Sequence, residues 1–166
     1  MSWKVAGLFA AAVLLGGAAA RAEKCPNMLI LLDRSGSMQG YKWETAVEAI
    51  NDFTAERQSV MRFGLYIFES PGDHCGSGLW RVRSDFYSHD EISDALSRLQ
   101  PGGLTPTPAA LAAAGATSDM TDASRRRFMI LLTDGDPTCP DEVNVEPNVD
   151  LAVTNLSKLL NDGIKT

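Results

Sequence analysis

Residues 28–37 read MLILLDRSGS, and this stretch decides the fold that we expect of the chain. Five apolar residues run without a break from Met28 to Leu32, as in a central strand of a sheet that is covered on both faces. The run ends in Asp33, and Ser35 and Ser37 follow at alternate positions. Because a buried strand end is rigid, the loop after it holds these side chains in a fixed array. Oxygen ligands without thiolate or imidazole suit a hard cation such as Mg²⁺.

Two later segments offer oxygen ligands in a similar way. A second apolar run, at residues 128–132, leads directly into Thr133-Asp134-Gly135. Between the two apolar runs, residues 102–107 read GGLTPT, which places Thr105 and Thr107 in a loop. The sequence therefore predicts a divalent-cation site that is assembled from three separated loops.

The first 22 residues have the pattern of a secretory signal peptide. Lys4 precedes an apolar stretch at residues 5–20, and a small-x-small cleavage site follows at residues 20–22. The alternative is a membrane anchor, but the apolar stretch is short and rich in alanine and glycine. We therefore expect a mature domain at 23–166 without a membrane span, which is secreted, periplasmic or attached to the cell surface.

The charge of the chain argues against a nucleic-acid partner. Removal of the signal peptide takes away Lys4 and Arg21 and no acidic residue, so the net charge falls from −6 to −8. A domain this acidic repels the phosphate backbone of DNA or RNA. We therefore expect no nucleic-acid partner.

The three cysteines leave their pairing open. Cys25, Cys75 and Cys139 show no C-x-x-C spacing of a zinc or redox site. Export favours a disulfide. An odd count leaves one thiol free or joined to another chain.

Helical and strand patterns alternate along the chain, which indicates an α/β fold. We expect a doubly wound, Rossmann-like sheet that is mostly parallel, with helices on both faces and one antiparallel edge strand. The edge strand is predicted at residues 80–86, where apolar and charged residues alternate. The other predicted elements are strands at 28–33, 63–68 and 128–133, and helices at 42–57, 88–99, about 106–117 and about 148–162.

Local signals refine the ends of these helices. Ser88 and Glu91 form a possible capping box. The last helix is expected to bury a broad apolar stripe, and Gly163 is placed to end it. The members of this stripe are Val149, Ala152, Val153, Leu156, Leu159 and Leu160. Residues 164–166 stand where an alternating fold would begin another strand, so we expect the C-terminal strand and helix to be missing and the domain to be incomplete.

The three loops together resemble the von Willebrand factor type A domain, and the resemblance covers about residues 27–166. Asp33-x-Ser35-x-Ser37 resembles the D-x-S-x-S motif of the metal-ion-dependent adhesion site of this family. Gly103-Leu104-Thr105 is similar to its G-x-T loop, and Thr133-Asp134-Gly135 to its T-D-G loop. The order of the predicted strands and helices also agrees.

The resemblance implies a set of five metal ligands. Ser35, Ser37 and Thr105 would bind the cation directly through their hydroxyls, and Asp33 and Asp134 would bind it directly or through water. Thr105 stands at the G-x-T position, but Thr107 is two residues away and is kept as the alternative ligand. The expected ion is Mg²⁺, with Mn²⁺ or Ca²⁺ as alternatives.

This ligand set implies protein recognition. Two carboxylates roughly neutralise a divalent ion, whereas hydroxyls add little negative charge. The cation stays electrophilic and keeps a coordination position open for a carboxylate of the partner protein. We therefore expect an exported metal-dependent protein-binding or adhesion module.

Two other functions are considered. The domain could be a structural or assembly subunit of a larger surface protein, in which the metal only stabilises the loops. It could also be a metal-dependent phosphotransferase with Asp33 as nucleophile, but Ser35 stands where that chemistry needs a second carboxylate. None of the three loops contains a lysine or histidine to act as acid or base. We therefore expect a protein that is not an enzyme.

Overall fold

Strand β1 (Asn27–Asp33) forms the centre of the sheet and is buried along its whole length. In the computed structural model, β1 pairs in parallel with β2 (Arg62–Phe68) and with β4 (Arg127–Leu132). Strand β3 (Leu79–Asp85) runs antiparallel to β2 at one edge of the sheet. The strand order is β3-β2-β1-β4-β5. The structure describes residues 24–69, 75–139 and 149–166.

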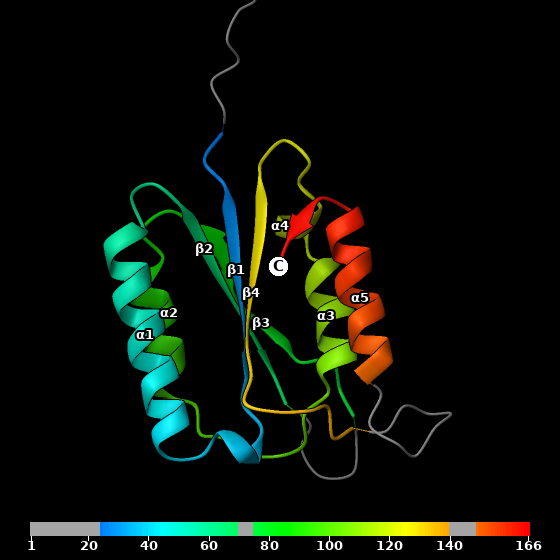
Figure 1. Ribbon diagram of the computed structural model, residues 1–166. Coiled ribbons are helices and arrows are strands. Elements are labelled where there is room, and N and C mark those ends of the chain that lie inside the picture. Colours follow the sequence, from blue (N-terminus) through cyan, green and yellow to red (C-terminus); the bar gives the residue numbers. More distant parts are fainter. Residues whose placement is uncertain (1–23, 70–74, 140–148) are drawn as a thin grey trace, which may run out of the picture.

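Helices cover both faces of this sheet (Figure 1). Helices α1 (Tyr41–Arg57) and α2 (His89–Ser97) lie on one face. Helices α3 (Thr107–Gly115), α4 (Ser118–Thr121) and α5 (Val149–Asn161) lie on the other. This arrangement confirms the predicted Rossmann-like fold with an antiparallel edge strand.

The continuous apolar run of β1 explains why both faces must be covered. Side chains alternate along a strand, so Ile30 and Leu32 pack into the core beneath α1 and α2. Leu29 and Leu31 pack into the core beneath α3, α4 and α5. All four side chains are at most 1% exposed. A strand buried in this way has a rigid end, and that end carries Asp33.

One prediction about a helix end is wrong. Ser88 forms no side-chain capping bond to α2; its hydroxyl instead donates to the carbonyl oxygens of Phe63 at 2.8 Å and Asp85 at 3.1 Å. The alanine-rich helix ends at Gly115, and α4 follows as a separate short helix.

The C-terminal region differs from the prediction in two respects. Val149, Val153 and Leu160 are 46%, 55% and 62% exposed, because only the narrower stripe around Ala152 and Leu159 packs against α3. The expected absence of a C-terminal strand is also wrong, since Ile164–Lys165 form β5 and pair in parallel with the start of β4. Gly163, which joins α5 to β5, has the positive φ of 80° expected of a residue that ends a helix.

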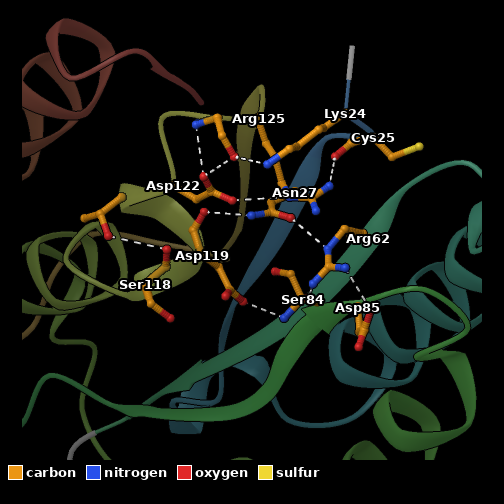
Figure 2. A network of polar contacts seen from close by, with 12 residues as sticks. Lys24, Cys25, Asn27, Arg62, Ser84, Asp85, Ser118, Asp119, Asp122 and Arg125 are labelled. Carbon is orange, nitrogen blue, oxygen red and sulfur yellow. Dashed lines mark hydrogen bonds and ion pairs between the residues drawn. The ribbon is translucent and has the colours of Figure 1, made fainter. Parts of the chain in front are cut away.

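A network of polar contacts holds the opposite end of β1 (Figure 2). The Asn27 side chain donates to the backbone oxygen of Asp119 at 2.9 Å and accepts from Arg62 Nε at 3.1 Å. Arg62 also donates to the backbone oxygen of Ser84 at 2.6 Å. These contacts join β1, β2, β3 and α4 at the amino end of β1, opposite the end that carries Asp33.

Two predictions concern membranes and export. No helix in the described residues has the length and apolar character needed to cross a bilayer. The predicted signal peptide, residues 1–22, lies outside the described residues.

Candidate metal site

Asp33 occupies the carboxyl end of β1 and is fully buried. Its Oδ1 accepts a hydrogen bond from the Ser35 amide at 2.7 Å, which forms an Asx turn directly after the strand. Its Oδ2 accepts from the Thr133 hydroxyl at 2.7 Å. Thr133 follows β4 directly, so the two neighbouring strand ends meet at this carboxylate.

Ser35 and Ser37 extend this group of oxygens toward Asp134. The two serine hydroxyls lie 3.0 Å apart, and Ser37 Oγ donates to Asp134 Oδ1 at 2.8 Å. The loop that contains them forms a short 3₁₀ turn, Gly36–Met38, before α1 begins. Asp33 accepts a hydrogen bond from the Ser35 amide, so a continuous series of hydrogen bonds joins four of the five predicted ligands, Asp33, Ser35, Ser37 and Asp134.

The loop that contains Thr105 lies against the first loop through backbone contacts. The Gly102 amide donates to the Arg34 oxygen at 2.7 Å, and the Gly36 amide donates to the Gly103 oxygen at 3.0 Å. Thr105 is 3% exposed, and its amide donates to the Thr138 hydroxyl at 2.9 Å. The fifth predicted ligand is therefore held between the loop after β1 and the loop after β4.

Thr107, the alternative ligand, is the first residue of α3 and is also buried. Within the described part of the chain, its hydroxyl has no hydrogen-bond partner. Both threonines are thus buried, and backbone contacts place the loop of Thr105 against the two other loops. The helix begins after Pro106 without a side-chain capping bond, so Thr105 does not serve as the N-cap of α3.

The two carboxylates have opposite electrostatic environments. Burial raises the pKa of Asp33 above its ordinary value, and hydrogen bonds from Ser35 and Thr133 offset this effect only in part. At Asp134, burial also acts to raise the pKa, but hydrogen bonds from Lys42 and Ser37 and the charge of Lys42 lower it overall. Within the described residues, Asp33 thus has no ion-pair partner, whereas Asp134 is paired with Lys42.

Lys42 was missed by the reasoning from sequence. Its ammonium group forms an ion pair with Asp134 Oδ2 and donates to the Ser37 oxygen at 3.2 Å. The residue belongs to α1 and not to any of the three loops, which is why their composition did not reveal it. Its position five residues after Ser37 was the only available signal.

Arg34 and Thr138 are further residues that the sequence did not single out. Arg34 forms an ion pair with Glu69, and donates to the Gln100 oxygen at 2.7 Å. It therefore joins the ends of β1 and β2 to the loop that leads to Thr105. Thr138 contacts Thr105 from the loop after β4. Both act on the site through neighbouring backbone, and no local pattern indicates such a contact.

The sequence profile of the von Willebrand factor type A domain matches residues 28–136. The chain belongs to the von Willebrand factor type A family. The match begins in β1 and ends two residues after Asp134, so it includes all three loops of the site.

One curated protein resembles this von Willebrand factor type A domain in sequence. The uncharacterized protein YwmC of Bacillus subtilis (strain 168) is 32% identical over 128 residues, or 68% of this chain and 56% of that protein. The chain thus spans about half the length of this curated relative.

Solved structures show the same fold. The pilus adhesin SpaC from Lactobacillus rhamnosus GG is 26% identical, with a TM-score of 0.60 over 71% of this chain and 16% of the adhesin. The proximal thread matrix protein 1 from the mussel byssus was solved with a zinc-occupied MIDAS motif. It is 17% identical, with a TM-score of 0.52 over 86% of this chain and 37% of that protein, and at this identity it shows the fold alone.

The residues of this von Willebrand factor type A domain suit a hard divalent cation. Among residues 24–69, 75–139 and 149–166, no three side chains of His, Cys, Asp or Glu gather closely enough to hold a metal ion by themselves. A cation would therefore need the serine and threonine hydroxyls as well as Asp33 and Asp134. All of these donors are oxygens, and a cation would neutralise the buried Asp33 carboxylate.

Proposed function

We propose that this domain is an exported protein-binding module that holds a divalent cation through Asp33, Ser35, Ser37, Thr105 and Asp134. The observation that carries the proposal is the series of short contacts among Asp33, Ser35, Ser37 and Asp134 across the ends of β1 and β4. Open α/β sheets bind their ligands at the carboxyl ends of the strands, where this cluster lies.

The chemistry of the donors supports recognition of an acidic partner. Two carboxylates roughly balance the charge of Mg²⁺, Mn²⁺ or Ca²⁺, and the hydroxyls leave the ion electrophilic. The coordination position that remains open would accept a carboxylate from the partner protein. The similarity to a pilus adhesin supports an adhesive role at the cell surface, and the predicted signal peptide supports export.

Two readings compete with this proposal. In the assembly-subunit reading, the cation stabilises the loops and recognises nothing. In the phosphotransferase reading, Asp33 attacks a phosphoryl group, but Ser35 stands where the second carboxylate is needed. Lys42 lies close to the site, but its ammonium group forms an ion pair with Asp134. The similarity to a pilus adhesin also favours a protein that is not an enzyme.

Isothermal titration of Mg²⁺ and Mn²⁺ into the mature chain tests the proposal. We expect saturable binding of one equivalent, since the three loops converge on one group of oxygens. Excess EDTA should then release any protein captured by the immobilised, metal-loaded domain. A folded chain that binds no cation would contradict the metal site. Cation binding combined with capture that EDTA leaves unchanged would favour the assembly-subunit reading.

Replacement of Lys42 by methionine should strengthen cation binding. The ammonium group of Lys42 contacts Asp134. It therefore competes with a bound cation for this carboxylate, and its positive charge repels the cation. We expect Lys42→Met to raise Mg²⁺ affinity roughly three- to tenfold at low ionic strength. Lys42→Arg keeps the charge and should leave the affinity close to that of the wild type. Weaker binding by Lys42→Met would show that the lysine instead orients Asp134 for the cation.

A further inference from the structure

The disulfide between Cys75 and Cys139 joins two loops at the end of the sheet where the candidate metal site lies. Cys75 precedes β3 in the connection that follows β2, and Cys139 lies in the loop that follows β4. The two cysteines are 64 residues apart in the sequence. Cys139 is 6% exposed, whereas Cys75 is an exposed residue. The bond thus connects the edge region of the sheet to the loop that carries Asp134.

Thr138, which precedes Cys139, forms hydrogen bonds with both the backbone amide and the backbone oxygen of Thr105. The Thr105 amide donates to the Thr138 hydroxyl at 2.9 Å. The Thr138 amide donates to the Thr105 oxygen at 3.1 Å. Both backbone groups of the predicted ligand are therefore bonded to one residue, and the position of that residue depends on the loop that Cys139 anchors.

The Cys75 side of the bond is attached to the sheet. The Tyr66 hydroxyl, on β2, donates to the Ser77 oxygen at 3.0 Å. Leu79 then pairs with Ile67 as β3 begins. At Gly78, a Cβ atom would lie 2.5 Å from the Ile67 oxygen, so the chain passes closely over the end of β2. Cys139 is thereby bonded to a segment that the sheet holds in place.

We propose that the Cys75–Cys139 disulfide and Thr138 form a clamp that holds Thr105 in position to receive the cation. The inference rests on the proposed metal site and extends it to residues outside the ligand set. In the oxidised protein, the covalent bond limits the motion of residues 134–139, and Thr138 transmits this constraint to the backbone of Thr105. Cation affinity therefore depends on the redox state of a bond that contacts no cation.

Reduction of the bond consumes two electrons. A phosphine reductant supplies them, takes the oxygen of one water molecule to become its phosphine oxide, and leaves two thiols, at Cys75 and Cys139. The metal ligands themselves contain no sulfur, so reduction changes the site only through the position of the loop. The same loss of constraint is obtained without a reductant in the variant Cys75→Ser/Cys139→Ser.

Titration of Mn²⁺ into matched variants of the mature chain tests the clamp. Every variant also carries Cys25→Ser, because Cys25 is a free thiol that could exchange with the disulfide. We expect about tenfold weaker Mn²⁺ binding for Cys75→Ser/Cys139→Ser and for Thr138→Val, as for other residues that orient metal ligands. Thr138→Ser keeps the hydroxyl and should restore the affinity. Circular dichroism at the titration temperature confirms that each variant is folded, so that lost stability is not mistaken for lost affinity.

Amide hydrogen exchange of Thr105 in the metal-free protein provides a second measurement. The Thr105 amide should exchange faster in Thr138→Val than in Thr138→Ser. If the oxidised parent binds Mn²⁺ and the folded cysteine and Thr138→Val variants bind it equally well, the clamp is refuted and the metal site stands. If the folded oxidised parent binds no cation, the metal site is refuted and the clamp with it. Weaker binding by both variants, with recovery in Thr138→Ser, supports the clamp.

Discussion

Replacement of Asp33 by asparagine is expected to weaken Mg²⁺ and Mn²⁺ binding by at least about a hundredfold. Asp33 is fully buried, and its carboxylate oxygens accept 2.7 Å hydrogen bonds from the Ser35 amide in its own loop and from the Thr133 hydroxyl after β4. Asparagine has the same size and keeps an oxygen for the Ser35 amide, so the loop geometry should persist. The charge that attracts the cation is lost. Isothermal titration measures this loss directly.

Thermal unfolding is an independent test of the predicted loss of cation binding in Asp33→Asn. A cation at a hundred times its dissociation constant stabilises the folded state by about 2.7 kcal/mol. The wild type should therefore melt at a higher temperature with metal, whereas Asp33→Asn should not respond. Burial raises the pKa of Asp33, so the ionised carboxylate destabilises the metal-free fold. Without metal, the variant should thus melt no lower than the wild type.

Asp136→Asn is the matched control for this experiment. Asp136 is an exposed aspartate two residues after Asp134, so its replacement removes the same charge from the same end of the molecule. We expect it to retain nearly full cation affinity and the full shift in melting temperature. Equal losses in Asp136→Asn and Asp33→Asn would mean that the cation is attracted by the overall negative charge and not by a defined site.

Replacement of Thr105 by valine should weaken cation binding by at least about tenfold. Valine has the shape of threonine without the hydroxyl, and the backbone contacts of Thr105 with Thr138 do not involve its side chain. The position of the loop should therefore be unchanged, and the variant tests the hydroxyl alone. Isothermal titration of Mn²⁺ is again the measurement.

Thr107→Val distinguishes the two candidate threonines. Within the described residues, the Thr107 hydroxyl is buried without a hydrogen-bond partner, and an unsatisfied buried hydroxyl destabilises a fold by about 1–3 kcal/mol. If Thr105 is the ligand, Thr107→Val should keep its cation affinity and melt at the same temperature as the wild type or higher. If Thr107→Val loses the cation while Thr105→Val retains it, Thr107 is the ligand and the present assignment is wrong.

Much of the fold could be predicted from the periodicity of the sequence. The apolar run before Asp33 requires cover on both faces of its strand, and the structure provides it with Ile30 on one side and Leu31 on the other. The alternating residues of β3 correctly indicated an edge strand. The apolar stripe predicted for α5 is broader than the buried one. Helical spacing shows which residues share a face, but not how much of that face a neighbouring element covers. Val153 and Leu160 remain exposed for this reason.

The sequence alone also determined which loops gather at the site. Asp33 and Asp134 each come after an apolar run, and parallel neighbouring strands end at the same edge of a sheet. Convergence of these two loops follows from the parallel pairing of β1 with β4. The sequence predicted a mostly parallel sheet, whereas the strand order is known only from the structure. The hydrogen bond from Ser37 to Asp134, at 2.8 Å, shows that the loops after β1 and β4 do meet.

Only the tertiary structure decided how the site is supported. The pairing of Cys75 with Cys139, the ion pair of Lys42 with Asp134, and the hold of Thr138 on Thr105 all join separate segments of the chain. No periodicity specifies such contacts, because they depend on how loops and a helix end are placed by the packed sheet. Local sequence therefore determines which oxygens form the proposed metal site, and the packing of the sheet, loops and helices determines how these oxygens are held.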